Sequence, residues 1–508
     1  MTTSRNKALL LTLSAATATA LTATALTATA LPAAAAGGPR AEIPRLNWHP
    51  CAKPDGPAAQ ECADLPVPLD YDDPAGPQIS VAVSRIRSDR PQARRGTLVV
   101  IPGGPGGSGV QRLTQKGAAL QEQLAGAYDL VAFDPRGVGG STTASCGLAP
   151  EDRYLTTLRS WPGPDGDIGE NLARSQRVAE ACARNGGPVL RSFTTANEVR
   201  DMDRLRMALG EAKLSAWGVS YGTYVGAVYA QTYPGRTDRW VLDSSGDPDP
   251  ERVARGWLAN MSKGADDRFP DFAAWAAHPD RDKEGLRLAP RPEEVRPLVL
   301  ELAASLDRAP RPSTTPGVPL TGNGLRQALQ NALYSDAAFP GFARLVTALR
   351  NPARTPALPP ELAGPLRDED AALTVAVVCN DVAWPAASRT GHQRAVDEDR
   401  ARHPLTAGMP VNVLPCSFWK SAPGHKPTRI TGHGPSNVLM VQSRRDPSTP
   451  HSESLKMRGA LGRRAVMVTV EQGGHGMYLG NGNACGNRTV TRFLTTGERP
   501  ARDTDCAN

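Results

Sequence analysis

The chain has 508 residues, a formal net charge of +7 at pH 7 and only 5% aromatic residues. It has no dense run of Lys and Arg, and its few aromatic side chains favour no base-stacking surface, so composition argues against a nucleic-acid partner. At this length the chain can fold as one large domain or up to about three.

The N-terminal segment predicts export. Arg5 and Lys7 precede an apolar Leu/Ala/Thr stretch from residue 8 to about residue 30, and residues 34–36 (Ala-Ala-Ala) offer a cleavage site. This is the pattern of a signal peptide, which we place at residues 1–36; an uncleaved membrane anchor is the alternative. No later stretch reaches the roughly 18 apolar residues that span a bilayer. We therefore expect a secreted, extracellular protein with no membrane contact after signal cleavage.

The next part of the chain alternates strands with glycine-rich turns and helices. Residues 78–86 alternate apolar and polar side chains, as a half-buried strand does. Residues 96–101 and 128–134 are continuous apolar strands, and each runs into a glycine-rich turn. This alternation predicts an α/β fold with a mainly parallel sheet flanked by helices.

The glycine-rich turn at residues 102–109 has two interpretations. It matches the G-x-G-x-x-G dinucleotide fingerprint, but Pro105 interrupts the turn and an exported protein would meet little soluble NAD. We favour an oxyanion loop, in which the N–H of Gly104 faces the negative oxygen of a tetrahedral intermediate. The N–H of Tyr221 would be the second donor. No cofactor is predicted.

The most informative motif is G-x-S-x-G at residues 218–222. The apolar strand 214–219 precedes the serine, and a helical pattern with small residues follows over 223–230. A serine between strand and helix lies on a tight, strained turn that exposes its hydroxyl to a base. A glycine-rich turn without chemistry is the alternative. The context predicts Ser220 as a catalytic nucleophile.

The strand–helix alternation stops after strand 239–243. From 250 to 430 the chain is rich in Ala, Pro and Arg and has the pattern of helices joined by proline loops, for example over 293–307. We interpret this segment as an inserted helical cap. The α/β core would then consist of residues 37–249 and 431–508.

The strand pattern returns at 437–442 and 465–470, and each strand is followed by a candidate partner for the serine. Asp446 follows the first strand and His475 the second, in the order along the chain that this fold requires. His475 would take the serine proton, and Asp446 would orient the imidazole. Asp243, also at a strand end, is the rival for the acid.

Cysteine usage agrees with export. The predicted signal peptide has no cysteine and the rest of the chain has eight, an even number that favours disulfides in an exported protein. No C-x-x-C motif or nearby histidine supports a zinc site, and no metal is predicted. Sequence alone does not fix the pairing, but closeness along the chain favours Cys51–Cys62, Cys146–Cys182, Cys379–Cys416 and Cys485–Cys506.

Five motifs occur together in a fixed order: Gly-Gly-Pro-Gly-Gly-Ser-Gly, Asp-Pro-Arg-Gly-Val-Gly-Gly-Ser, Gly-Val-Ser-Tyr-Gly-Thr, Arg-Asp-Pro-Ser-Thr-Pro and Gly-Gly-His. With them the chain resembles the α/β-hydrolase serine peptidases related to prolyl iminopeptidase, and among these the secreted tripeptidyl aminopeptidases of actinomycetes. The resemblance runs from about residue 45 to the end. It implies release of short peptides, typically tripeptides, from a free N-terminus, with Ser220, Asp446 and His475 as the triad.

An exopeptidase must also bind the ammonium group of its peptide substrate. Asp381 and Asp247 are candidates by position, although either carboxylate could simply be solvated or cap a turn. Asp247 lies where the family usually has an apolar or Asn-containing turn. The alternatives to an aminopeptidase are a secreted esterase or other acyl hydrolase, a catalytically silent binding protein and a dinucleotide-dependent oxidoreductase.

Overall fold

The computed structural model describes five stretches of the chain, 43–51, 56–153, 159–251, 255–481 and 483–507. The predicted signal peptide at residues 1–36 lies outside the described residues. Ile43–Asn508 form one compact unit.

The described strands form one ten-stranded sheet with the order β1-β2-β3-β5-β4-β6-β7-β8-β9-β10. Pairing is antiparallel among β1, β2, β3 and β5 and parallel from β5 through β4 to β10. The fold is therefore α/β with a mainly parallel sheet, as predicted. The strands are β1 (His49–Pro50), β2 (Gln60–Pro68), β3 (Gln78–Ile86), β4 (Gly96–Ile101), β5 (Tyr128–Phe133), β6 (Leu214–Val219), β7 (Thr237–Asp243), β8 (Val438–Arg445), β9 (Ala465–Gly473) and β10 (Thr504–Cys506).

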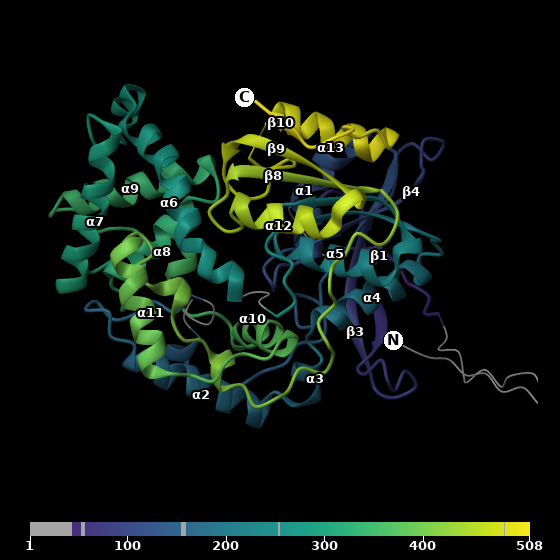
Figure 1. The fold of residues 1–508 in the computed structure, drawn as a ribbon, viewed down its shortest axis with the longest axis horizontal. Coiled ribbons are helices and arrows are strands. Elements are labelled where there is room, and N and C mark those ends of the chain that lie inside the picture. The colour runs from purple at the N-terminus through teal and green to yellow at the C-terminus, as the bar shows by residue number, and fades with distance from the viewer. Residues whose placement is uncertain (1–42, 52–55, 154–158, 252–254, 482, 508) are drawn as a thin grey trace, which may run out of the picture. The chain divides into compact units, whose positions relative to one another are not determined.

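Helices cover both faces of this sheet (Figure 1). Helices α1 and α13 pack on one face, and α4, α5 and α12 pack on the other. Because both faces are covered, the central strands are continuous apolar runs rather than alternating ones. The α-helices are α1 (Gly109–Leu124), α2 (Gly169–Asn185), α3 (Gly187–Arg191), α4 (Thr195–Ala208), α5 (Tyr221–Thr232), α6 (Arg255–Ala277), α7 (Pro292–Arg308), α8 (Gly322–Ala332), α9 (Phe339–Arg350), α10 (Asp368–Asp381), α11 (Arg389–Arg402), α12 (His451–Leu461) and α13 (Ala484–Thr496).

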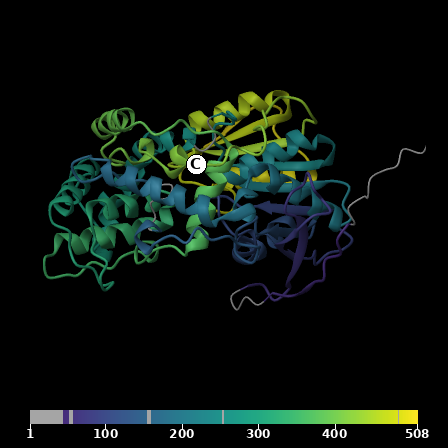
Figure 2. The same cartoon turned by 90° about the horizontal axis from the view of Figure 1, so that it is seen from below.

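The insertion between β7 and β8 is helical, and part of it has its own core. Buried side chains of α6, α7, α8 and α9 form a hydrophobic cluster separate from the two clusters of the sheet. Figures 1 and 2 both show these helices on the side away from strands β1–β3. Helix α10 lies within the insertion, but its buried side chains belong to a cluster of the sheet. We propose that residues 250–430 form a cap. Helices α6, α7, α8 and α9 give it a core of its own, and α10 links it to the sheet.

The eight cysteines form four disulfides, and the pairing is the one that closeness along the chain favours. Three of them link residues of the expected α/β core, and one ties α10 to the short 3-10 helix η7 (Pro415–Phe418). The bonds are Cys51–Cys62, Cys146–Cys182, Cys379–Cys416 and Cys485–Cys506. Among the described residues, no group of His, Cys, Asp and Glu side chains is arranged to hold a metal ion.

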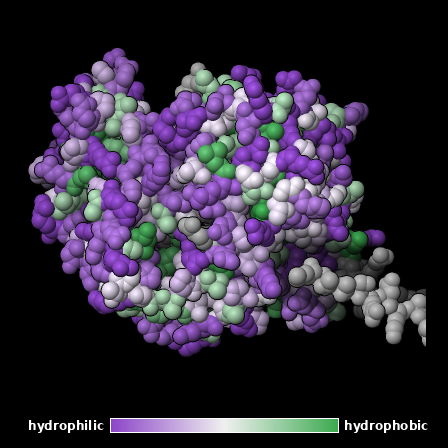
Figure 3. All heavy atoms as spheres, viewed as in Figure 1, coloured by the Kyte–Doolittle hydropathy of each residue, from purple (hydrophilic) through white to green (hydrophobic). Residues whose placement is uncertain are grey.

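The visible surface is mostly hydrophilic, with hydrophobic residues in small scattered patches (Figure 3). Ile43 and Leu455 are large hydrophobic side chains that are exposed. Within the described parts of the chain, no helix has the length and apolar character that crossing a membrane requires.

Candidate active site

Ser220 lies at the turn between β6 and α5, and its backbone is strained. Its φ of 59° and ψ of −128° fall outside the regions that non-glycine residues normally adopt. Backbone hydrogen bonds hold this conformation: the Ser220 N–H donates to the carbonyl of Asp243 at 3.0 Å, and the Thr223 N–H donates to the carbonyl of Ser220 at 2.8 Å. The turn presents Ser220 at the wall of a cavity.

Close backbone contacts explain the two glycines of the motif. A Cβ on Gly218 would lie 2.4 Å from the carbonyl oxygen of Gly222. A Cβ on Gly222 would lie 2.5 Å from the carbonyl oxygens of both Ile101 and Pro102. Backbone atoms cannot rotate away, so both positions exclude any larger residue without a shift of the main chain.

The predicted oxyanion loop lies directly against Ser220. A Cβ on Gly103 would lie 2.7 Å from the Val219 carbonyl oxygen and 2.9 Å from the Cβ of Ser220. Gly104 lines the same cavity as Ser220. Tyr221 is the first residue of α5, so its N–H has no acceptor within the helix. The segments that carry both predicted donors thus meet at Ser220, and their role as an oxyanion hole stays a prediction.

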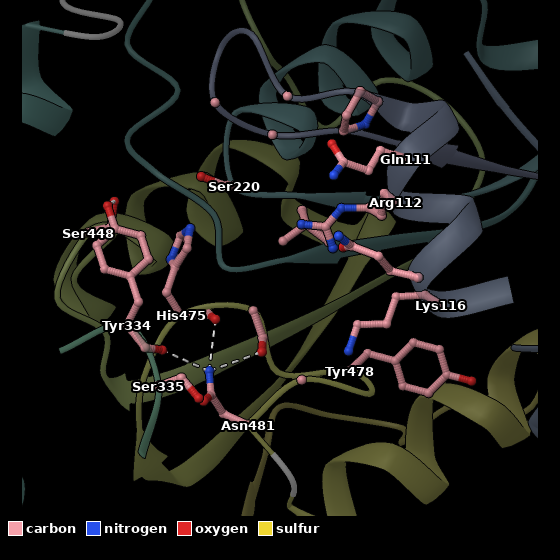
Figure 4. A pocket seen from close by; sticks show the side chains of 18 of the residues that line it. Gln111, Arg112, Lys116, Ser220, Tyr334, Ser335, Ser448, His475, Tyr478 and Asn481 are labelled. Atoms are coloured by element: carbon pink, nitrogen blue, oxygen red, sulfur yellow. Dashed lines mark hydrogen bonds between the residues drawn. The ribbon is translucent and has the colours of Figure 1, made fainter. Parts of the chain in front are cut away.

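His475 and Asp446 are hydrogen-bonded to each other. His475 Nδ1 lies 2.9 Å and 3.0 Å from the two carboxylate oxygens of Asp446, and the side chains are 9% and 0% exposed. They follow β9 and β8, which are adjacent and parallel, so both emerge at one edge of the sheet. With its proton on Nδ1 the ring donates to Asp446 and keeps Nε2 as a base. His475 and Ser220 line the same cavity (Figure 4).

The turn that follows Asp446 fixes its carboxylate. The backbone N–H groups of Ser448 and Thr449 each donate to one oxygen at 2.8 Å. The Thr449 hydroxyl donates to the other oxygen at 3.0 Å. These donors are the polar residues of the Asp-Pro-Ser-Thr turn, which the sequence shows but whose role we did not predict. They orient the buried carboxylate toward His475.

Asp243, the rival acid, serves a different part of the site. Its carboxylate accepts the backbone N–H groups of Met477 and Tyr478, both at 2.8 Å. The neighbouring Ser244 hydroxyl accepts the N–H of Gly476 at 2.9 Å. The end of β7 therefore holds the loop that carries His475. Burial raises the pKa of Asp243, and these hydrogen bonds oppose that shift.

Tyr334, which follows α8, contacts His475 from the side of the insertion. Its carbonyl oxygen accepts the His475 N–H at 2.9 Å, and the two rings meet edge to face with centroids 5.1 Å apart. Its hydroxyl donates to Ser448 Oγ at 3.0 Å. The sequence analysis missed this residue, because nothing in a helical pattern shows which side chain reaches a distant loop.

Two neighbouring spaces adjoin Ser220 and share part of their lining. The larger has a volume of about 810 Å³ and is lined by the oxyanion loop, α1, Tyr334 and the loop that carries His475. The smaller has about 100 Å³ and is lined mainly by apolar side chains, including Trp257, Met261 and Val378. Gly104 and Ser220 line both spaces. A substrate carbonyl at Ser220 would have room on either side.

Asp247 does not lie in either space. It lines a separate cleft, and its carboxylate forms an ion pair with Lys456 at 2.9 Å. Its carbonyl oxygen accepts the indole N–H of Trp257 at 2.9 Å. Asp247 therefore lies behind Trp257, and its carboxylate is already paired with Lys456. The structure does not support Asp247 as the ammonium anchor.

Asp381 is also outside both spaces. It accepts hydrogen bonds from the backbone N–H and the hydroxyl of Thr195, and that hydroxyl also contacts the Tyr221 hydroxyl. Burial raises the pKa of Asp381 to about 6 and raises the pKa of the nearby Glu198 well above its ordinary value. Asp381 is instead part of a polar network with the buried side chains of Thr195, Tyr221 and Glu198, which the sequence did not reveal.

Comparison with known proteins agrees with these features. A family model described as TAP-like protein matches residues 404–506, the range that contains Asp446 and His475. The chain is 34% identical over 489 residues to the tripeptidyl aminopeptidase of Streptomyces lividans, covering 92% of this chain and 88% of the relative. It is 28% identical over 500 residues to serine protease Hip1 of Mycobacterium tuberculosis, covering 91% of each. Carboxylesterase B of Mycobacterium tuberculosis is also 28% identical over 500 residues, with 91% of this chain and 90% of the relative covered.

Proposed function

Because the chain belongs to the tripeptidyl aminopeptidase family of α/β-hydrolase serine peptidases, we propose that it is secreted and releases tripeptides from the free N-termini of peptides. The observation that carries this proposal is the hydrogen-bonded pair of His475 and Asp446 in the cavity of the strained Ser220. The four disulfides support a site of action outside the cell.

In the acylation step the Ser220 Oγ attacks the carbonyl carbon of the scissile peptide bond. His475 Nε2 takes the hydroxyl proton, while Asp446 stabilises the imidazolium that forms. The N–H groups of Gly104 and Tyr221 stabilise the negative oxygen of the tetrahedral intermediate. The C–N bond then breaks, and His475 delivers its proton to the departing amine. The products are an acyl-enzyme on Ser220 and a peptide that is three residues shorter.

In the deacylation step water replaces the departed amine. His475 takes a proton from the water as its oxygen attacks the ester carbonyl, and the same two N–H groups stabilise the second intermediate. The Ser220 oxygen leaves and recovers its proton from His475. The tripeptide is released with a free carboxylate, and the triad returns to its starting state.

An esterase with the same triad is the second candidate function. The relationship to carboxylesterase B supports it, since one fold and one triad can serve different leaving groups. The higher identity to a tripeptidyl aminopeptidase favours the peptidase.

Hydrolysis of a tripeptidyl chromogenic amide tests the proposal. We expect the substrate with a free N-terminus to be cleaved in one step to the tripeptide and the chromophore. The N-acetylated substrate should react much more slowly, because a free ammonium group is required for binding. Ser220→Ala should abolish both reactions, since the remaining donors give only residual catalysis.

Two results would contradict the proposal in different ways. Equal cleavage of the free and acetylated amides would remove the aminopeptidase and leave a general serine hydrolase. Activity on simple esters with none on either amide would favour the esterase.

A further inference from the structure

Two cations on helix α1 face the cavity of Ser220 and are not used by the triad. Arg112 and Lys116 are four residues apart, so they lie on the same face of the helix. Figure 4 shows both side chains extending from α1 into the pocket that Ser220 and His475 also line. A pair of positive charges here is a feature that peptide-bond hydrolysis alone does not require.

The contacts of these cations leave their charge available. The Arg112 guanidinium lies 5.6 Å from the ring centroid of Trp217, and Lys116 Nζ donates to the carbonyl of Leu479 at 2.7 Å. No Asp or Glu is among the described residues that line the cavity. The negative charge of Asp243 raises the pKa of Arg112, but the Asp243 carboxylate already accepts two backbone N–H groups. The cavity thus carries positive charge that its own walls do not neutralise.

The electrostatics of the pair favour an added anion. Burial lowers the pKa of Arg112, and both burial and the charge of Arg112 lower the pKa of Lys116. A carboxylate between them would offset the mutual repulsion and restore part of the lost solvation. An ammonium group in the same place would add a third positive charge. The charge of this pair therefore disfavours the free N-terminus of a substrate on this side of Ser220.

The position of His475 shows which part of a peptide faces the cations. The imidazole delivers a proton to the departing amine, so the leaving peptide lies on the histidine side of the scissile bond. The larger space is lined by His475, Gly476 and Tyr478 of the histidine loop, together with Arg112 and Lys116. The smaller space contains no residue of that loop, and we assign it to the acyl side. Its lining is mainly apolar, but Arg159 lines both spaces, where it donates to the neutral side chains of Asn331 and Tyr334.

We propose that Arg112 and Lys116 form a carboxylate-binding subsite for the leaving peptide. The preferred substrates then carry a negative charge close after the scissile bond, from an acidic side chain or from a nearby C-terminus. This inference rests on the proposed function, because it assumes cleavage behind the third residue. The larger space would then favour short peptides and peptides with an acidic residue after the cleavage site.

Cleavage of a matched peptide series tests the subsite. The peptides are Ala-Ala-Ala-Xaa-Ala amides with Glu, Gln or Lys at the fourth position, and Ala-Ala-Ala-Gln-Ala with a free carboxylate. Release of the dipeptide product, followed by mass spectrometry, gives kcat/KM for each. We expect Glu to exceed Gln by on the order of tenfold, the equivalent of one well-placed charge interaction, and Lys to be the poorest. The free acid compared with its amide shows whether a terminal carboxylate also binds.

Charge-removing variants show where the preference arises. Arg112→Gln, Lys116→Gln and the double variant should bring the Glu/Gln ratio of kcat/KM toward one. Lys213→Gln removes one positive charge from an exposed position before β6, at the opposite end of that strand from Ser220, and should keep the ratio. In the unmodified protein, added salt should also lower the ratio, which tests the charge effect without any substitution.

Equal kcat/KM for the Glu and Gln peptides, together with equal kcat/KM for the free acid and its amide, would overturn the subsite. A preference for negative charge that is as large in the double variant as in the unmodified protein would overturn it as well. Failure of the proposed function has a different signature. In that case no peptide of the series is cut after its third residue, whatever its charge.

Discussion

Ser220, His475 and Asp446 are each fixed by main-chain hydrogen bonds before any substrate binds. The Ser220 N–H is held by the carbonyl that ends β7, and the His475 N–H by the carbonyl of Tyr334. Asp446 accepts two backbone N–H groups of its own turn. A constellation held in this way loses little free energy to reorganisation during the reaction. The geometry therefore supports catalysis by these three residues.

Sequence reasoning reached these residues because each one follows a strand of recognisable pattern. It could not reach Tyr334, Arg112 or Lys116, whose roles depend on packing between distant segments. Arg112 and Lys116 occupy ordinary polar positions of an amphipathic helix. Only the tertiary structure shows that this face of the helix lines the cavity of Ser220. Position along the chain suggested Asp247 and Asp381 as ammonium anchors. In the structure neither residue lines the cavities at Ser220, and each carboxylate already has partners.

Asp381 gives a prediction about stability and pH. Its raised pKa, about 6 against an ordinary value of 3.8, means that the folded protein binds this proton more tightly than the unfolded chain does. The resulting stability is fully present below about pH 4 and is lost as pH rises through about 6. In Asp381→Asn this dependence disappears, because asparagine does not titrate.

Urea unfolding at several pH values measures this effect. From pH 4 to pH 7 the free energy of unfolding of Asp381→Asn should rise relative to the unmodified protein, by on the order of 2 kcal/mol. The rise would be concentrated between pH 4 and pH 6. A difference between the two proteins that stays constant over this range would show that the carboxyl group is not perturbed.

At the scale of elements, buried strands were the most predictable part of the chain. The expected strands 96–101 and 214–219 have the same bounds as β4 and β6. Their apolar runs reflect burial on both faces, which leaves no polar alternation to interpret. Strands β1, β2 and β10 were not predicted. β2 contains two prolines, and β1 and β10 have only two and three residues, so propensity gave little sign of them.

The turn between β6 and α5 gives a prediction at this scale. Gly222→Ala should lower stability by about 1–3 kcal/mol, because its Cβ would meet two backbone carbonyl oxygens. The main chain must shift to make room, and a displaced Ser220 should lower kcat/KM on the tripeptidyl amide by roughly 100-fold. Urea unfolding and amide hydrolysis measure the two effects.

Gly235→Ala is the matched control for this substitution. It lies in the short 3-10 helix η2 (Pro234–Arg236), and an added Cβ there has no atom within 4 Å. Its stability should stay within about 0.5 kcal/mol of the unmodified protein, with unchanged kcat/KM. Equal effects of the two substitutions would show that the close contacts of Gly222 do not determine the conformation of the turn at Ser220.

At the scale of the whole molecule, the sheet and the insertion both contribute to the candidate site. Strands β6, β8 and β9 bring together Ser220, Asp446 and His475, the proposed nucleophile, acid and base, while Tyr334 comes from the segment between β7 and β8. The segment between β5 and β6 also reaches the insertion, since Trp161 packs with Ala407 and Met409. The sequence predicted an insertion but not this second contact, because only the tertiary fold joins segments so far apart. Two separate excursions from the sheet therefore contribute to the walls of the Ser220 cavity, through Arg159 and Tyr334.

The identity of the nucleophile and the length of the acyl group are best tested together. A tripeptidyl diphenyl phosphonate with a free N-terminus mimics the substrate and forms a stable bond to a reactive serine. We predict one adduct per chain, located on Ser220 by peptide mass spectrometry, and much slower labelling by the N-acetylated probe. Labelling at another residue, no labelling, or equal rates for the two probes would contradict a Ser220-dependent tripeptidyl aminopeptidase.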